Sequence, residues 1–105
     1  METSETRALR AVIQSRRKEF DELLIKYKAG RPLLFGSVAR GVAQPGSDID
    51  ILVEMDPADG NILMRASGLA DEVGQLFRPT PVDIFPVQLL KHSVSESALN
   101  EAVAL

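Results

Sequence analysis

The spacing of hydrophobic residues predicts two long helices. Over residues 5–28, apolar side chains recur every three or four positions and form one stripe opposite Arg, Lys and Glu. Gly30 and Pro32 are expected to end this helix, because glycine and proline commonly follow a helix C-terminus. Residues 61–77 repeat the pattern and predict a second helix, which Pro79 ends.

Short runs of apolar and β-branched residues predict three strands. They cover residues 33–35, 48–53 and 82–85. Ser93 and Glu96 have the spacing of a capping box, which predicts a last helix running to the C-terminus. This order of elements predicts an α+β fold, with a small mixed sheet of three or four strands and helices packed on one face.

The composition is that of an ordinary folded protein. With 45% hydrophobic and 26% charged residues, residues 1–105 are expected to form a single domain. The net charge of -3 argues against a domain that grips a nucleic-acid backbone, so no direct nucleic-acid binding is expected. The lack of cysteine excludes disulfides and Cys-ligated zinc. The sequence shows no signal peptide or membrane span, and we expect a cytoplasmic protein without membrane contact.

Gly36 and Ser37 stand where the first predicted strand meets a tight turn. Glycine lets the backbone approach a ligand closely, and the following N–H groups and the Ser37 hydroxyl could then point at phosphate oxygens. A plain junction between a strand and a turn explains the same two residues. On their own, they do not decide between these interpretations.

Three aspartates fall on the second and third predicted strands. Residues two apart on a strand face the same side, so Asp48 and Asp50 should project together, with Ile49 facing the core. A divalent cation between the two carboxylates would turn their repulsion into attraction. Asp83 could join them from a neighbouring strand. Alternatively, Asp48 caps a turn and Asp50 is a solvated residue on the open face of the sheet.

Two segments together resemble a known signature. Residues 36–41 read Gly-Ser-Val-Ala-Arg-Gly, and residues 47–53 read Ser-Asp-Ile-Asp-Ile-Leu-Val. They resemble the minimal nucleotidyltransferases, the MNT group of the DNA polymerase beta superfamily. The resemblance covers essentially the whole chain, and all three expected acidic positions are retained. It implies the nucleotidyltransferase fold and a magnesium-dependent transfer of a nucleotidyl group, with ATP as the expected substrate.

The resemblance also implies roles for individual residues. Asp48 and Asp50 would bind two magnesium ions, and Asp83 would share the one nearer the acceptor. Asp83 is also the best candidate to receive the proton of the acceptor hydroxyl. These three are the expected catalytic and metal-binding residues.

The remaining implied roles concern the triphosphate. Gly36 and Ser37 would hold the β- and γ-phosphates, and Arg40 would neutralise charge just beyond them. Arg40 could equally be a surface arginine. Arg65 could approach a nucleotide base, although an exposed helix face accounts for it as well.

The resemblance further suggests a partner. MNT proteins are often encoded beside a HEPN-domain ribonuclease toxin, and some act as antitoxins by adding adenylyl groups to a tyrosine of that toxin. The segment after the third predicted strand is too short for a separate acceptor domain, which also favours an acceptor on another protein. Three alternatives stay open: an antitoxin that acts by contact alone, an enzyme for a small-molecule acceptor such as an aminoglycoside, and a structural metal-binding domain.

Overall fold

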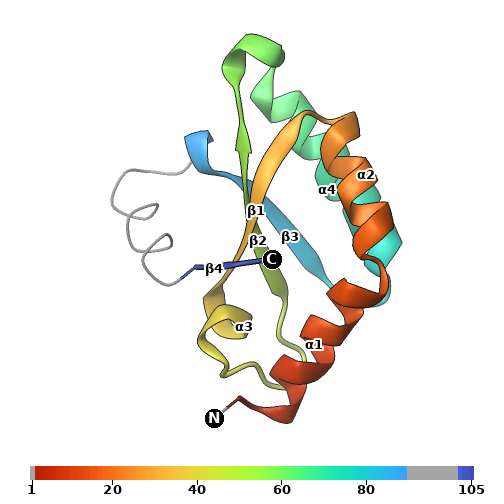
Figure 1. Ribbon diagram of the computed structural model, residues 1–105, viewed down its shortest axis with the longest axis vertical. Helices are drawn as coiled ribbons and strands as arrows, with labels where there is room; N and C mark the ends of the chain where they lie inside the picture. Colours follow the sequence, from red (N-terminus) through yellow and green to blue (C-terminus); the bar gives the residue numbers. More distant parts are fainter. Residues whose placement is uncertain (1, 90–101) are drawn as a thin grey trace.

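The described strands form one mixed sheet at the centre of the fold (Figure 1). It is seen in a computed structural model, which describes residues 2–89 and 102–105. The strands are β1 (Ala29–Phe35), β2 (Ile49–Met55), β3 (Val82–Pro86) and β4 (Val103–Ala104), in the spatial order β3-β2-β1-β4. β1 pairs antiparallel with β2 and with β4, whereas β2 and β3 are parallel.

Three longer helices cover one face of this sheet (Figure 1). They are α1 (Ser4–Ser15), α2 (Arg17–Lys26) and α4 (Ile62–Phe77). The short α3 (Gly36–Arg40) follows β1, while the 3-10 turns η1 (Pro57–Asp59) and η2 (Val87–Leu89) precede α4 and follow β3. Ile49, Ile51 and Val53 alternate along β2 and are completely buried in the core under the helices. This confirms the α+β fold. No helix in the described ranges is long and apolar enough to cross a membrane.

The single helix predicted over residues 5–28 is wrong. The chain leaves helical geometry at Arg16, where φ is -121° and ψ is 20°, so that α1 and α2 are separate helices. α1 packs against α3, and α2 packs against α4 and β1, so the two halves have different neighbours. Both halves keep the predicted apolar stripe, whose fully or nearly buried members are Leu9, Ile13, Phe20 and Leu24. Because the break contains neither glycine nor proline, the sequence carries no signal for it.

The first strand is longer than predicted. The strand expected over residues 33–35 extends back to Ala29, so Gly30 and Pro32 lie inside β1 and do not end a helix. The turn that leads from α2 into β1 instead uses Lys28, which has a φ of 56°. The pairing with β2 is irregular around Pro32, which suits a residue without an N–H to donate.

The second helix and the other two strands are confirmed to within two residues at each end. The helix predicted over residues 61–77 is α4, and the side chain of Asn61 caps it by accepting a backbone N–H at 3.0 Å. The strand predicted over residues 48–53 is β2, which leaves Asp48 just before it. The strand predicted over residues 82–85 is β3.

Arg65 holds several backbone segments together and does not serve as a plain exposed helix residue. Its guanidinium donates hydrogen bonds to the carbonyl oxygens of Tyr27 (3.1 Å), Lys28 (2.8 Å), Asp56 (2.9 Å) and Gly60 (3.1 Å). These carbonyls belong to the α2–β1 turn and to the η1 turn. Arg65 therefore fixes the start of α4 against both turns.

The last predicted helix falls mostly outside the described residues. Ser93 and Glu96 lie in this part. The predicted extension of the helix to the C-terminus is wrong at its end, because residues 103–104 form β4. β4 pairs with Leu33 and Leu34 of β1 and so covers the part of the β1 edge formed by these two residues.

Candidate active site

Two carboxylates lie side by side at the start of the parallel strands. Asp50 of β2 is the direct register partner of Asp83 of β3. Direct partners point to the same face of a sheet, and neighbouring strands are about 4.8 Å apart. Because Ile49 and Ile51 point into the core under the helices, alternation places Asp50 and Asp83 on the opposite face.

Asp48 completes a group of three interacting carboxylates. Burial, the negative charge of Asp83 and that of Asp48 raise the pKa of Asp50 to about 6. Burial, the charge of Asp48 and a hydrogen bond with Asp48 raise the pKa of Asp83. Such mutual effects require all three side chains in one neighbourhood. The structure therefore brings together Asp48, Asp50 and Asp83, which we call the acidic triad.

Gly36 lies directly against the acidic triad. A Cβ atom added to Gly36 would come within 2.6 Å of Oδ2 of Asp50, and the φ of Gly36 is +74°. A larger residue would thus be strained by its backbone and would also displace the carboxylate. Phe35, the residue before Gly36, is the register partner of Asp50, which explains the close approach. Glycine is required here by the neighbouring carboxylate, a reason that the sequence did not reveal.

α3 places the other predicted nucleotide-binding residues next to the acidic triad. It begins at Gly36, followed by Ser37, and ends at Arg40, and no side chain in the described part of the chain caps its N-terminus. Arg40 is exposed, and its positive charge lowers the pKa of Asp50, opposing the effect of the carboxylates. The predicted nucleotide-binding and catalytic residues therefore gather at one end of the sheet.

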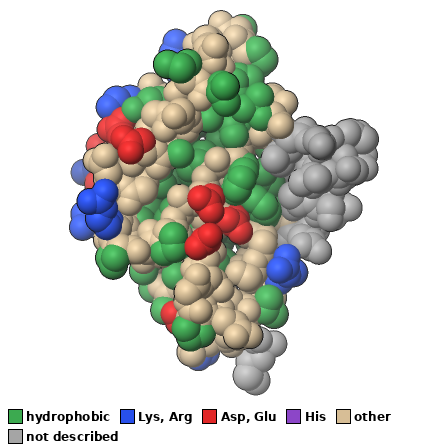
Figure 2. Space-filling view, turned by 180° about the vertical axis from the view of Figure 1, so that it is seen from behind, with side chains coloured by type: hydrophobic (Ala, Val, Ile, Leu, Met, Phe, Trp, Pro, Cys, Tyr) green, Lys and Arg blue, Asp and Glu red, His purple; other side chains and the backbone are tan. Residues whose placement is uncertain are grey.

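Hydrophobic side chains border the acidic triad on the same face. Phe35 and Phe85 contact each other edge to face, with ring centroids 5.3 Å apart. Leu52, two residues after Asp50, is completely buried. Figure 2 shows acidic side chains gathered in the middle of one face of the molecule, with hydrophobic surface beside them. Neither Leu52 nor the two phenylalanines were predicted as neighbours of the site, although the register that pairs Asp50 with Asp83 also pairs Leu52 with Phe85.

Comparison with known families identifies the family to which the chain belongs. The sequence pattern described as "Nucleotidyltransferase domain" matches residues 14–105, which is most of the chain and includes the whole site. The chain belongs to the nucleotidyltransferase domain family. Members of this family typically use a nucleoside triphosphate and a divalent metal ion.

A solved structure supports the assignment of this nucleotidyltransferase domain. That structure, whose own assignment as a minimal nucleotidyltransferase is provisional, is 33% identical in sequence. The comparison covers 100% of this chain and 97% of that chain, with a TM-score of 0.73. No curated protein matches the chain significantly. The shared fold over the full length confirms the nucleotidyltransferase fold.

The acidic triad of this nucleotidyltransferase domain suits magnesium as part of a ligand set. In residues 2–89 and 102–105, no three His, Cys, Asp or Glu side chains are gathered closely enough to hold a metal ion by themselves. Magnesium, however, usually binds through one or two carboxylates together with water and substrate phosphates. The hard carboxylate oxygens and their mutual repulsion fit an open site of this kind, which a substrate would complete.

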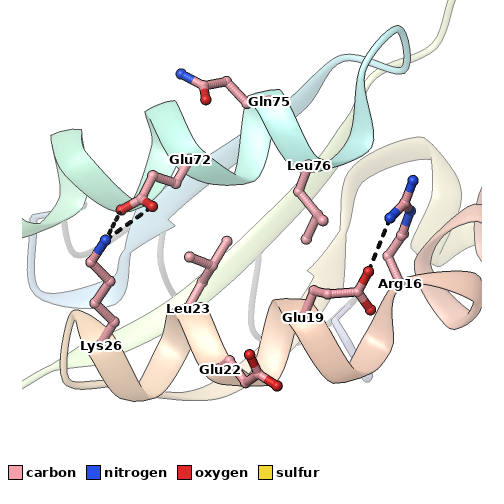
Figure 3. Close-up of a pocket in the computed structure, with 8 residues that line it drawn as sticks. All are labelled: Arg16, Glu19, Glu22, Leu23, Lys26, Glu72, Gln75 and Leu76. Atoms are coloured by element: carbon pink, nitrogen blue, oxygen red, sulfur yellow. Dashed lines mark hydrogen bonds and ion pairs between the residues drawn. The ribbon is translucent and has the colours of Figure 1, made fainter.

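A separate groove lies in the helical layer of the nucleotidyltransferase domain (Figure 3). It has a volume of about 670 Å³ and is lined by residues of α2 and α4 and by Arg16. Both basic side chains in its lining are paired within the groove, since Lys26 contacts Glu72 at 2.8 Å and Arg16 contacts Glu19 at 3.0 Å. The helical layer covers the face of the sheet opposite the acidic triad. The groove therefore contributes no residue to the site.

Proposed function

We propose that this protein transfers an adenylyl group from ATP to a hydroxyl group on a partner protein. The observation that carries the proposal is the gathering of the acidic triad against Gly36 and beside Ser37 and Arg40, in a chain of the nucleotidyltransferase domain family. A triphosphate is itself negatively charged, so three carboxylates would repel it unless cations lay between them. This requirement favours a magnesium-dependent reaction over simple nucleotide binding.

Asp48, Asp50 and Asp83 would hold magnesium together with the phosphates of ATP. Two magnesium ions would supply charge stabilisation for the attacking and leaving oxygens of an in-line displacement. Gly36 and Ser37 would contact the β- and γ-phosphates through the N-terminal turn of α3. Arg40 would neutralise further negative charge from its exposed position beside Asp50.

The proposed reaction balances as a single displacement. The acceptor oxygen forms a bond to the α-phosphorus, and the bond from that phosphorus to the leaving pyrophosphate breaks. The proton of the acceptor hydroxyl passes to the carboxylate of Asp83, whose raised pKa makes it a stronger base than an ordinary aspartate. The protein acts mainly by holding the reactants in line and by balancing charge.

We propose a HEPN-domain toxin as the partner, with this protein as the antitoxin of a HEPN/MNT toxin–antitoxin pair. The support for this partner is the resemblance of residues 36–41 and 47–53 to the MNT group. An antitoxin of this kind would neutralise the toxin by covalent modification. The loss of one catalytic carboxylate should then abolish neutralisation even if the two proteins still bind.

Co-expression of the toxin with wild type or Asp50→Asn tests the proposal. We expect growth with the wild type, growth arrest with the variant, and an adenylyl mass increase on the toxin with the wild type alone. Full neutralisation by Asp50→Asn would indicate an antitoxin that acts by contact. Label transfer from ATP to an aminoglycoside with no protein acceptor present would instead indicate a small-molecule enzyme.

A further inference from the structure

The N-terminal residues Thr3 and Thr6 bind the loop that follows α3. Thr6 is the one polar or charged side chain that is fully buried in the described part of the chain. Its Oγ1 accepts the backbone N–H of Ala43 at 3.0 Å. Thr3 Oγ1 lies 2.5 Å from the carbonyl oxygen of Ala43, and Thr3 N–H donates to the carbonyl of Gly41 at 3.0 Å.

The protons of this arrangement can be assigned from chemistry alone. A carbonyl oxygen only accepts, so the hydroxyl of Thr3 donates to Ala43. Its single proton is then used, and the hydroxyl of Thr6 must donate to Thr3 Oγ1 at 2.8 Å. Thr3 Oγ1 also accepts the N–H of Thr6 at 3.1 Å. Every donor of the two hydroxyls is thus satisfied in one closed network, which we call the threonine clasp.

The threonine clasp holds the middle of the loop between the two halves of the candidate site. Ala43 is nearly completely buried and lies between Ser37 and Asp48. On one side, the N–H of the preceding residue, Val42, donates to the carbonyl of Ser37 at 3.0 Å. On the other side, Gln44 and Ser47 form a turn immediately before Asp48. The N–H of Ser47 donates to the carbonyl of Gln44, and the N–H of Gln44 donates to Oγ of Ser47, each at 2.9 Å.

The threonine clasp comes from a part of the chain that the family pattern does not include. That pattern matches residues 14–105, whereas Thr3 and Thr6 precede it. In Figure 1 the N-terminal end of α1 lies beside α3 and the loop that follows it. A segment outside the matched domain is therefore tied to the loop that carries the site.

We infer that Thr6, supported by Thr3, is a positioning residue that sets the geometry of the loop from Ser37 to Asp48. Its effect on nucleotide handling rests on the proposed function, whereas its effect on the loop does not. Without the hydroxyl of Thr6, the buried N–H of Ala43 loses its acceptor. The loop then samples other arrangements, and the triphosphate contacts and the acidic triad lose their common alignment.

Thr6→Val and Thr6→Ser test this inference, with Ser15→Ala as the matched control. Valine keeps the shape of threonine without the hydroxyl, and serine keeps the hydroxyl. Ser15 donates from the exposed end of the same helix to the carbonyl of Val12, far from the loop. Two measurements apply to all four proteins below their melting temperatures: amide hydrogen exchange over residues 36–48, and calorimetric affinity for ATP with magnesium.

We expect Thr6→Val to speed exchange of the Ala43 amide and to weaken ATP affinity, each on the order of tenfold. Thr6→Ser should restore both, and Ser15→Ala should change neither. If Thr6→Val does not fold, Thr3→Ala is measured instead, because it removes the bond to the Ala43 carbonyl but keeps the bond from the Ala43 N–H. It should give the same changes in weaker form.

Two results would overturn the inference. One is an Ala43 amide that exchanges as slowly in Thr6→Val as in the wild type. The other is a lowered melting temperature with unchanged ATP affinity, which would make the threonine clasp purely structural. A wild-type protein that binds no ATP would count against the proposed function alone, since the exchange measurement still reports on the loop.

Discussion

Replacing Asp50 with asparagine removes one negative charge from the acidic triad and keeps the shape of the side chain. Burial and the charges of Asp83 and Asp48 raise the pKa of Asp50 from 3.8 to about 6. A tenfold change in acidity corresponds to about 1.4 kcal/mol, so this effect could reach about 3 kcal/mol. Asp50 is only half-buried, and water screens its charge. We therefore expect the ionised carboxylate of Asp50 to destabilise the wild-type protein by about 1 kcal/mol at neutral pH.

The effect of Asp50 on stability depends on pH in one direction. Its pKa in the folded protein lies above the unfolded value, so the folded state binds more protons between about pH 4 and about pH 6. The contribution of Asp50 to the free energy of unfolding therefore falls as the pH rises through this window. Asp50→Asn should gain about 1 kcal/mol, or about 5 °C in melting temperature, above this window and almost nothing below it.

Thermal unfolding in EDTA, above and below this pH window, measures this difference. The metal-free wild type is compared with Asp50→Asn, and with Asp59→Asn as a control that removes an exposed carboxylate from η1. The control should melt close to the wild type at both pH values. If Asp50→Asn melted below the wild type at neutral pH, its carboxylate would be a structural acceptor, and the repulsion argument would be refuted.

Three further predictions concern the candidate site and the hydrogen bonds that Arg65 of α4 donates to four backbone carbonyls. Gly36→Ala should lower the free energy of unfolding by about 2 kcal/mol, because the added Cβ meets Asp50. Gly74→Ala, which has open space around the added Cβ, should raise the free energy of unfolding by about 0.5–1 kcal/mol. Urea unfolding measures both values, and equal effects of the two substitutions would contradict this prediction. Arg65→Lys should lower the free energy of unfolding by about 2 kcal/mol in the same assay, because an ammonium group cannot reproduce the planar guanidinium that reaches four carbonyls. A variant as stable as the wild type would show that these hydrogen bonds contribute little. Magnesium alone should raise the melting temperature much less than magnesium with ATP, since the protein holds no complete metal site among its described residues; equal shifts would indicate a preformed site.

The sequence predicts an element well where its local signals agree with its tertiary contacts. In α4 the apolar spacing and the cap at Asn61 both point to the observed helix. At Arg16 the local signals and the tertiary contacts disagree. The helical pattern is continuous there, whereas the helix breaks because α1 and α2 pack on different neighbours. At Gly30 and Pro32, residues that commonly follow helices lie inside β1, where an irregular pairing accommodates them.

The candidate site follows the same division. Alternation along one strand was enough to predict that Asp50 faces away from the core. The position of Asp83 beside it depends on the pairing of β2 with β3, which local sequence does not encode. The contact of Gly36 with Asp50 depends likewise on the register of β1 and β2. The threonine clasp joins residues far apart in the chain, so no local pattern indicates that Thr6 is buried.

The most direct test of nucleotidyl transfer follows the phosphate that moves. ATP labelled at the α-phosphate, and in a parallel reaction at the γ-phosphate, is incubated with magnesium and a lysate of the source organism, using wild type or Asp50→Asn. We expect a protease-sensitive band that carries the α-label and forms only with the wild type. A band that carries the γ-label, or an α-labelled band that Asp50→Asn forms equally well, would contradict it.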